Sequence, residues 1–117
     1  MTDDQRPSGD IAPSQAHDLT ALVAYGPGAV VSRTLRKSGV GTLTIFAFDA
    51  GEELSEHSAP FDAYVQVLEG ELELTIGGTP VPTRAGRIVL MPANVPHAVH
   101  ATERSKMLLV MFKEPGK

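Results

Sequence analysis

The sequence contains no cysteine among its 117 residues. This absence excludes disulfides, thiolate zinc sites and cysteine nucleophiles, so any bound metal has to be held by histidine, carboxylate or amide oxygen. Long apolar runs are also lacking, and the first ten residues, MTDDQRPSGD, are acidic and have no hydrophobic segment of the signal-peptide type. We therefore expect a protein without a signal peptide or a membrane span, with the cytoplasm as its compartment.

Charge of one sign is not concentrated anywhere in the chain. The net charge is −4, and the charged residues, 21% of the total, are spread over both halves. A nucleic-acid-binding protein would carry a basic stripe or patch, so we expect no nucleic-acid partner.

The length of the chain is that of one domain with one core. Residues 1–15 are polar and contain two prolines and a glycine, which predicts a flexible N-terminal arm before a single domain over residues 16–117.

Helical patterns are scarce, whereas strand patterns are frequent. AHDLTALVAY (16–25) predicts one helical turn capped by Asp18, and no long helical pattern follows it. Segments rich in β-branched and aromatic residues, bounded by turn residues, predict strands over residues 29–38, 41–50, 62–70, 71–78, 86–92, 97–101 and 106–112.

The segment ELELTIGG (71–78) shows how these strands are expected to pack. Leucine and isoleucine alternate strictly with glutamate and threonine, so one face is predicted to be buried and the other wet. Gly77 and Gly78 then predict a hairpin turn, because such turns need positive φ. Many short strands, eleven glycines and nine prolines indicate an all-β antiparallel sandwich, barrel or jelly roll. Barrels of this width can enclose a small ligand.

Two histidines are the main candidates for chemistry. His57 closes GEELSEH (51–57), and His97 lies in GRIVLMPANVPHAVHA (86–101). Side chains that far apart in sequence converge at a barrel mouth if their strands are neighbours, and imidazole is a good ligand for zinc, iron, nickel or copper. Two imidazoles alone do not complete a metal site.

The spacing around these histidines resembles the two motifs of the cupin superfamily. The first motif is matched by Gly51, His57 and the run YVQVLEG closing at Gly70, and the second by Gly86, Pro92, Pro96 and His97. The resemblance spans about residues 40–113 and implies a jelly-roll barrel, the double-stranded β-helix. In cupins the first motif usually supplies a histidine, a second histidine two residues later and a glutamate or histidine four residues after that, and the second motif adds a last histidine. Those positions are here His57, Ala59, Ala63 and His97.

The two alanines favour a ligand pocket over a complete metal site, because alanine has no lone pair and leaves space. The pocket is predicted around His57, His97, Ala59 and Ala63. Nearby polar residues offer no clear replacement ligand: alternation sends Gln66 and His100 to the opposite faces of their strands, and the direction of Asp62 is not fixed by the pattern. A reduced metal site of His57, His97 and water or a third ligand stays open, as does the choice among divalent zinc, nickel, iron and copper.

Other chemistry-bearing residues receive structural interpretations. Three carboxylates are expected to be a solvated loop (Glu52, Glu53 and Glu56), and His17 is expected at the surface. The methionines are interpreted as core filler, although thioethers lining a cavity would suit an apolar ligand (Met91, Met107 and Met111). A basic run is interpreted either as facing an anionic ligand or as a charged strand edge (Arg33, Arg36 and Lys37).

The run YVQVLEG has apolar residues on both faces, which an exposed sheet would not need. Cupins similar to this chain are commonly homodimers that pack through sheet faces, so a homodimer is expected.

Three hypotheses for function remain open: a metal-free cupin that binds a small molecule, a metal-dependent enzyme of the dioxygenase or isomerase type, and a non-catalytic interaction module. Neither enzymatic activity nor a substrate is assigned by the sequence.

Overall fold

The computed structural model describes residues 9–113, and within them it contains nine strands and one short 3-10 helix, η1. In chain order these are η1 (Leu19–Leu22), β1 (Val30–Ser38), β2 (Gly41–Phe48), β3 (Glu53–His57), β4 (Asp62–Glu69), β5 (Glu71–Ile76), β6 (Thr79–Arg84), β7 (Ile88–Met91), β8 (His97–Ala101) and β9 (Ser105–Phe112).

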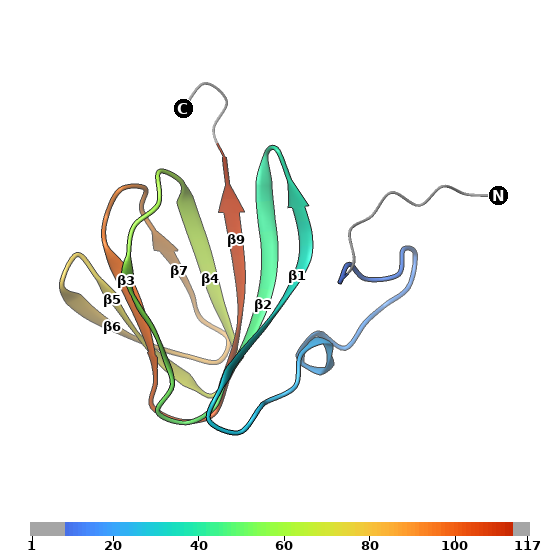
Figure 1. Ribbon diagram of the computed structural model, residues 1–117, viewed down its shortest axis with the longest axis horizontal. Coiled ribbons are helices and arrows are strands. Elements are labelled where there is room, and N and C mark those ends of the chain that lie inside the picture. Colours follow the sequence, from blue (N-terminus) through green and yellow to red (C-terminus); the bar gives the residue numbers. More distant parts are fainter. Residues whose placement is uncertain (1–8, 114–117) are drawn as a thin grey trace.

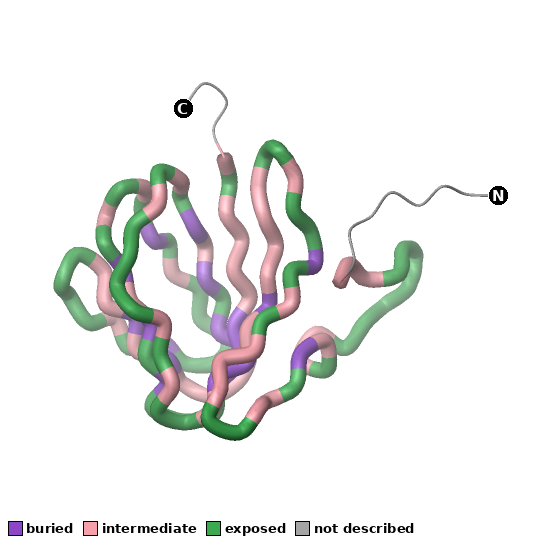
Figure 2. The backbone as a smooth tube through the Cα atoms, viewed as in Figure 1, coloured by how far each residue is buried: buried purple, intermediate pink, exposed green. Residues whose placement is uncertain are grey.

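The strands form two antiparallel sheets that face each other (Figure 1). The larger sheet has the order β1-β2-β9-β4-β7, and the smaller sheet has the order β3-β8-β5-β6. Buried residues from both sheets form the core between them, as Figure 2 shows along the inner strands. The core consists of Phe48, Ala63, Val65, Val67, Leu72, Leu74, Met91, Val99, Ala101 and Met107. The predicted all-β jelly-roll architecture is confirmed.

The hairpin between β5 and β6 follows its sequence pattern. Leu72 and Leu74 are completely buried, as their alternation with glutamate predicts. Ile76 pairs with Thr79 across a two-residue turn, in which Gly77 and Gly78 have φ of 57° and 84°. Both torsions lie in the left-handed region, so glycine is required by the turn.

Two strands were not predicted. The carboxylates of GEELSEH are predicted to lie in a solvated loop; Glu53 and Glu56 are exposed, but the loop is wrong, because residues 53–57 form β3 and pair with β8. Most β3 side chains are exposed, so no apolar alternation marks the strand. Strand β6 contains Pro80 and Pro82, which argue against a central strand. They are tolerated because β6 is the edge of the smaller sheet, where their missing N–H groups break no ladder.

The segment before β1 packs on the outer face of the larger sheet. The predicted helical turn is present as η1, but the Asp18 side chain makes no capping bond to the backbone and instead accepts a hydrogen bond from Thr20. Val23, Ile45 and Ala47 are buried in a second apolar cluster on this face. Of the predicted arm over residues 1–15, residues 1–8 lie outside the described residues.

Polar contacts hold this segment to the barrel. Arg33 donates to the carbonyl oxygens of Gly9 at 2.7 Å and Leu22 at 3.1 Å. The role of Arg33 is therefore to bind the chain's own backbone, which neither interpretation of the basic run anticipated. At the other end of the segment, Tyr25 donates to the carboxylate of Glu69. Burial, followed by this hydrogen bond, raises the pKa of Tyr25.

Beyond this segment the outer face of the larger sheet carries apolar side chains that no described residue covers completely. Ile88 is 63% exposed, Leu90 45% and Phe112 52%. Tyr64 lies in register with Leu90 on one side and Val110 on the other. These five residues are named the outer apolar patch. Among residues 9–113 the structure has no helix of the length and hydropathy needed to cross a bilayer.

Candidate functional site

His57 and His97 form a cross-strand pair between β3 and β8 of the smaller sheet. The ladder between these strands is irregular from Leu54 to His57, and it resumes with His57 opposite His97. Directly opposite residues on antiparallel strands have close side chains. The two imidazole rings lie edge to face, with centroids 4.4 Å apart.

The ring nitrogens of the pair have well-defined neighbours. Nε2 of His97 lies 3.2 Å from Nε2 of His57. Nδ1 of His57 lies 2.9 Å from the carbonyl oxygen of Ser55, and Nδ1 of His97 lies 3.2 Å from that of Val95. A carbonyl oxygen only accepts, so we assign the proton of each neutral imidazole to Nδ1, which donates it. The two Nε2 atoms then carry the lone pairs.

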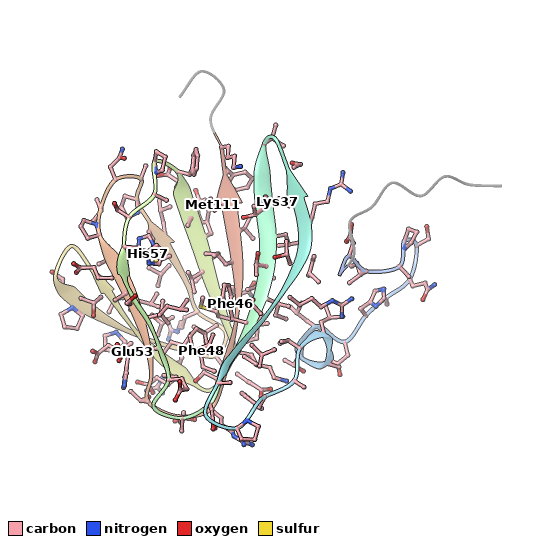
Figure 3. The ribbon with its side chains drawn as sticks, viewed as in Figure 1. Lys37, Phe46, Phe48, Glu53, His57 and Met111 are labelled. Carbon is pink, nitrogen blue, oxygen red and sulfur yellow. The ribbon has the colours of Figure 1, made fainter. Side chains whose placement is uncertain are left out.

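The pair borders a cavity of about 170 Å³ between the two sheets. Figure 3 labels His57 on β3 and Met111 on β9, which belong to opposite sheets and both line this cavity. The only side-chain nitrogen or oxygen atoms among the lining residues are those of the imidazoles. The lining consists of Leu54, His57, Ala59, Ala63, Met91, His97, Val99, Met107, Leu109 and Met111. The structure thus brings together His57, His97, Ala59 and Ala63 around one space.

The two imidazoles have different environments. His97 is 7% exposed, whereas His57 is exposed. Burial of His97, followed by the nearby charge of His57 when protonated, lowers the pKa of His97, although the bond to the Val95 carbonyl opposes this change. His97 is therefore a neutral imidazole at pH 7, since its pKa lies below the ordinary value of 6.5.

The polar residues expected outside the pocket are outside it. Gln66 is exposed between the buried Val65 and Val67, and His100 is exposed on the face of β8 opposite His97, so both alternation predictions are confirmed. Asp62, whose direction the sequence left open, is exposed and accepts a hydrogen bond from the Ala93 backbone at 2.9 Å. Asp62 therefore fastens the loop between β7 and β8 and supplies no ligand to the cavity.

The histidine pair meets half of the requirements of a metal site. Two nitrogens that each lie about 2.0–2.1 Å from a tetrahedral metal ion are roughly 3.3 Å apart, close to the observed 3.2 Å. Within residues 9–113, however, no group of three or more histidine, cysteine or carboxylate side chains is placed to hold a metal. Ala59 and Ala63 occupy the cavity wall where further donors would be needed. The protein's own donors among the described residues thus do not complete the coordination shell of a metal ion.

The sequence offers two interpretations of the methionines, core filler and thioethers that line a cavity. Ala63 pairs with Met91 of β7 on one side and with Met111 of β9 on the other, so the three residues form one row across the larger sheet. Met107 lies further along β9 and also lines the cavity. Met91 and Met107 therefore belong to the core and also line the cavity, whereas the half-buried Met111 lines the cavity only.

Two facing antiparallel sheets of this strand order define a small jelly-roll barrel, and a histidine pair lies beside the cavity between its sheets. The chain belongs to the Cupin_2 family, described as a cupin domain, whose family model matches residues 44–112. Both histidines of the pair lie within this match, which agrees with the resemblance seen in the two motifs.

Similar proteins match this chain over most of its length. The uncharacterized protein SCO3923 from Streptomyces coelicolor is 30% identical over 98 residues, which cover 84% of this chain and 91% of that protein. The crystal structure of the conserved SPY1581 protein of unknown function from Streptococcus pyogenes is 36% identical, with a TM-score of 0.87 over 92% of this chain and 94% of that chain. A cupin 2 conserved barrel domain protein from Leptotrichia buccalis is 41% identical, with a TM-score of 0.81 over 83% of this chain and 47% of that chain.

Proposed function

We propose that this protein binds a small organic molecule in the cavity between its sheets, with His57 and His97 holding the polar group of the ligand. The observation that carries the proposal is a cavity of about 170 Å³ whose wall is apolar apart from two imidazoles. Binding sites typically combine such a wall with a few converging polar atoms. The volume is below the roughly 300 Å³ at which sites for drug-sized molecules begin, so the ligand is small.

The side chains around the cavity support occupancy by a ligand. Ala59 and Ala63 leave the space unfilled, and empty apolar space in a core costs stability because its lining loses dispersion contacts. The methionine side chains are flexible and can adjust to the shape of a guest. A molecule that fills the space restores these contacts and stabilises the folded state by mass action.

The experiment is a fragment screen by ligand-observed NMR, combined with mass spectrometry of small molecules released from the purified full chain. Ala63→Leu places a larger side chain in the row between Met91 and Met111. We expect Ala63→Leu to weaken binding of the identified fragments at least about tenfold, while His100→Ala, on the outer face of β8, leaves binding unchanged. Equal affinity of the wild type and Ala63→Leu would place the ligand elsewhere and contradict the proposal.

A metal-dependent enzyme is the second candidate, favoured by the 3.2 Å separation of the two Nε2 atoms. In that case substrate or water has to supply the remaining ligands of a zinc, nickel, iron or copper ion. Elemental analysis of tag-free protein, beside the double variant His57→Ala/His97→Ala, tests it. About one metal ion per chain in the wild type and none in the variant would support the metal-dependent enzyme. No metal in either protein, after incubation with each ion, would contradict it.

The hypothesis of a non-catalytic interaction module predicts a filled barrel, and the cavity of about 170 Å³ argues against it.

We also propose that two copies of this chain associate through the outer apolar patch (Tyr64, Ile88, Leu90, Val110 and Phe112). The five residues are uncharged, with Asp62 opposite Phe112 and Gln66 opposite Ile88 as polar neighbours on the same face. An apolar centre with a polar rim is typical of homodimer interfaces. A two-fold dimer uses the same surface on both subunits and so needs no complementary charge on a different partner. Elsewhere on this outer face the segment before β1 covers the apolar side chains of β2. The outer apolar patch lacks such a cover within the described chain, and a second copy would supply it.

A further inference from the structure

The polar end of the cavity consists of hydrogen-bond acceptors. Both histidines use Nδ1 in the same way, each against the carbonyl oxygen two residues before it in the chain, Ser55 for His57 and Val95 for His97. Because both carbonyls can only accept, both Nδ1 atoms carry a hydrogen, and the neutral ring then has only a lone pair at Nε2. The cavity thus ends at two Nε2 lone pairs rather than at a donor and an acceptor.

Two lone pairs 3.2 Å apart repel each other unless an electron-poor group lies against them. Four such groups exist: an additional proton, a metal ion, a water molecule, or a hydrogen-bond donor of a ligand. A water molecule can donate to the Nε2 atoms but leaves the apolar wall without the contacts that the hydrocarbon body of a ligand restores. A metal ion lacks further protein donors, as described above. An additional proton would make the pair cationic; none of the ten lining residues carries a carboxylate to balance it, and only the solvent-exposed side of His57 would hydrate the charge.

The remainder of the wall cannot satisfy an anionic ligand. Eight of the ten lining residues are aliphatic or carry a thioether, and none of these side chains has an N–H or O–H group. A carboxylate in this space would lose its water without gaining donors, and the two Nε2 lone pairs would repel it. A hydroxyl or N–H group would instead point its hydrogen at the lone pairs and relieve their repulsion.

From this geometry we infer that the cavity selects a small apolar molecule with a neutral hydrogen-bond donor, a hydroxyl or N–H group, and rejects the carboxylate of the same shape. The inference rests on the proposed function, because it names the chemistry of the ligand that the cavity would hold. Nε2 of His57 and His97 accepts the donor, and the apolar wall takes the hydrocarbon body.

The test uses two pairs of probes that match in shape and differ in the polar group. An apolar cavity of about 150 Å³ holds benzene, so single-ring molecules suit the 170 Å³ found here. Phenol is compared with toluene, and benzamide with benzoate, by 1H–15N NMR titration of the full chain at pH 8. We expect phenol to bind at least about tenfold tighter than toluene, and benzamide at least about tenfold tighter than benzoate.

Variants assign the preference to the imidazoles. The double variant His57→Ala/His97→Ala is expected to bring the phenol-to-toluene affinity ratio close to one while retaining toluene binding, and His100→Ala is expected to leave the ratio unchanged. Imidazole 15N spectra of the wild type are expected to show both rings protonated at Nδ1 alone. Tightest binding by benzoate, equal binding of phenol and toluene, or doubly protonated rings at pH 8 would overturn the inference. Absence of binding by all four probes, together with a fragment screen without hits, would instead contradict the proposed organic-ligand site itself.

Discussion

At the scale of single residues, His97 is expected to make the stability of the protein depend on pH. Burial lowers the pKa of His97 below 6.5 in the folded state, whereas the unfolded chain has the ordinary value. The unfolded state therefore binds the proton more readily, and the free energy of unfolding falls as the pH decreases from about 6.5 through the folded pKa. Above about pH 6.5 this contribution to stability is fully present.

Urea denaturation of the wild type, His97→Gln and His100→Gln between pH 8 and pH 5 measures this effect. Glutamine is neutral throughout the range, so His97→Gln should lose part of the decline in stability that the wild type shows. His100 is exposed, and His100→Gln should decline like the wild type. A His97→Gln variant whose stability falls as steeply as that of the wild type would show that His97 is not the responsible group.

The sequence predicts the placement of single residues where a strand alternates regularly. Gln66 and His100 are assigned correctly because a period of two fixes the face of each residue once one neighbour is known to be buried. Asp62 follows Pro60 and a short loop, so its phase is not fixed by any pattern. Arg33 binds backbone carbonyls of residues before β1, a contact between segments that no local pattern encodes.

At the scale of elements, the turns between strands depend unequally on glycine. Gly70 joins β4 to β5 with φ of 77°, and a Cβ there would collide with the Arg104 carbonyl oxygen and the Ser105 hydroxyl. Gly78 in the β5–β6 turn has φ of 84°, but a Cβ there would meet nothing within 4 Å. Alanine at Gly78 should thus cost only the strain of positive φ, about 1–2 kcal/mol. Alanine at Gly70 adds a steric clash with backbone to that strain.

Chemical denaturation of Gly70→Ala and Gly78→Ala compares the two turns. Gly70→Ala is expected to lower the free energy of unfolding by at least about 2 kcal/mol more than Gly78→Ala, because the end of β4 has to move away from the start of β9. Equal losses in the two variants would mean that the β4–β5 turn relaxes without cost and that the close approach of Gly70 to Ser105 is not required by the fold.

The strands themselves show which elements can be recognised from sequence. Seven strands are predicted because each presents β-branched or aromatic residues between turn signals. Strands β3 and β6 lack this signal: β3 has mostly exposed side chains, and β6 carries two prolines. Both acquire their strand conformation from pairing with neighbours, β8 for β3 and β5 for β6. Tertiary pairing thus overrides local propensity in these two elements.

At the scale of the whole molecule, the cavity arises from pairings between segments far apart in the sequence. Ala63 becomes the centre of a row with Met91 and Met111 only because β4 lies between β7 and β9. The smaller sheet contributes the histidine pair through the pairing of β3 with β8. The cupin resemblance supplied the fold and the positions of the histidines, whereas the methionines in the wall and the orientation of the imidazoles follow from sheet topology.

Oligomeric state tests the remaining expectation at this scale. The outer apolar patch predicts a dimer, so multi-angle light scattering should give a mass near twice the chain mass of 12.4 kDa. Ile88 is 63% exposed within the patch, and Val40 is 68% exposed in the turn between β1 and β2, outside it. A lysine at either site replaces an apolar side chain of similar exposure, so the two variants differ mainly in position.

Ile88→Lys should weaken association at least about tenfold, because a two-fold contact would bury the charge on both subunits. Val40→Lys should associate like the wild type, since its charge stays in water. Circular dichroism is expected to be the same for all three proteins, because neither side chain belongs to the core. Dissociation by Val40→Lys to the same extent, or a monomeric wild type, would contradict dimerisation through this patch. A dimer unaffected by Ile88→Lys would place the interface on another surface and leave the apolar side chains of β7 facing water.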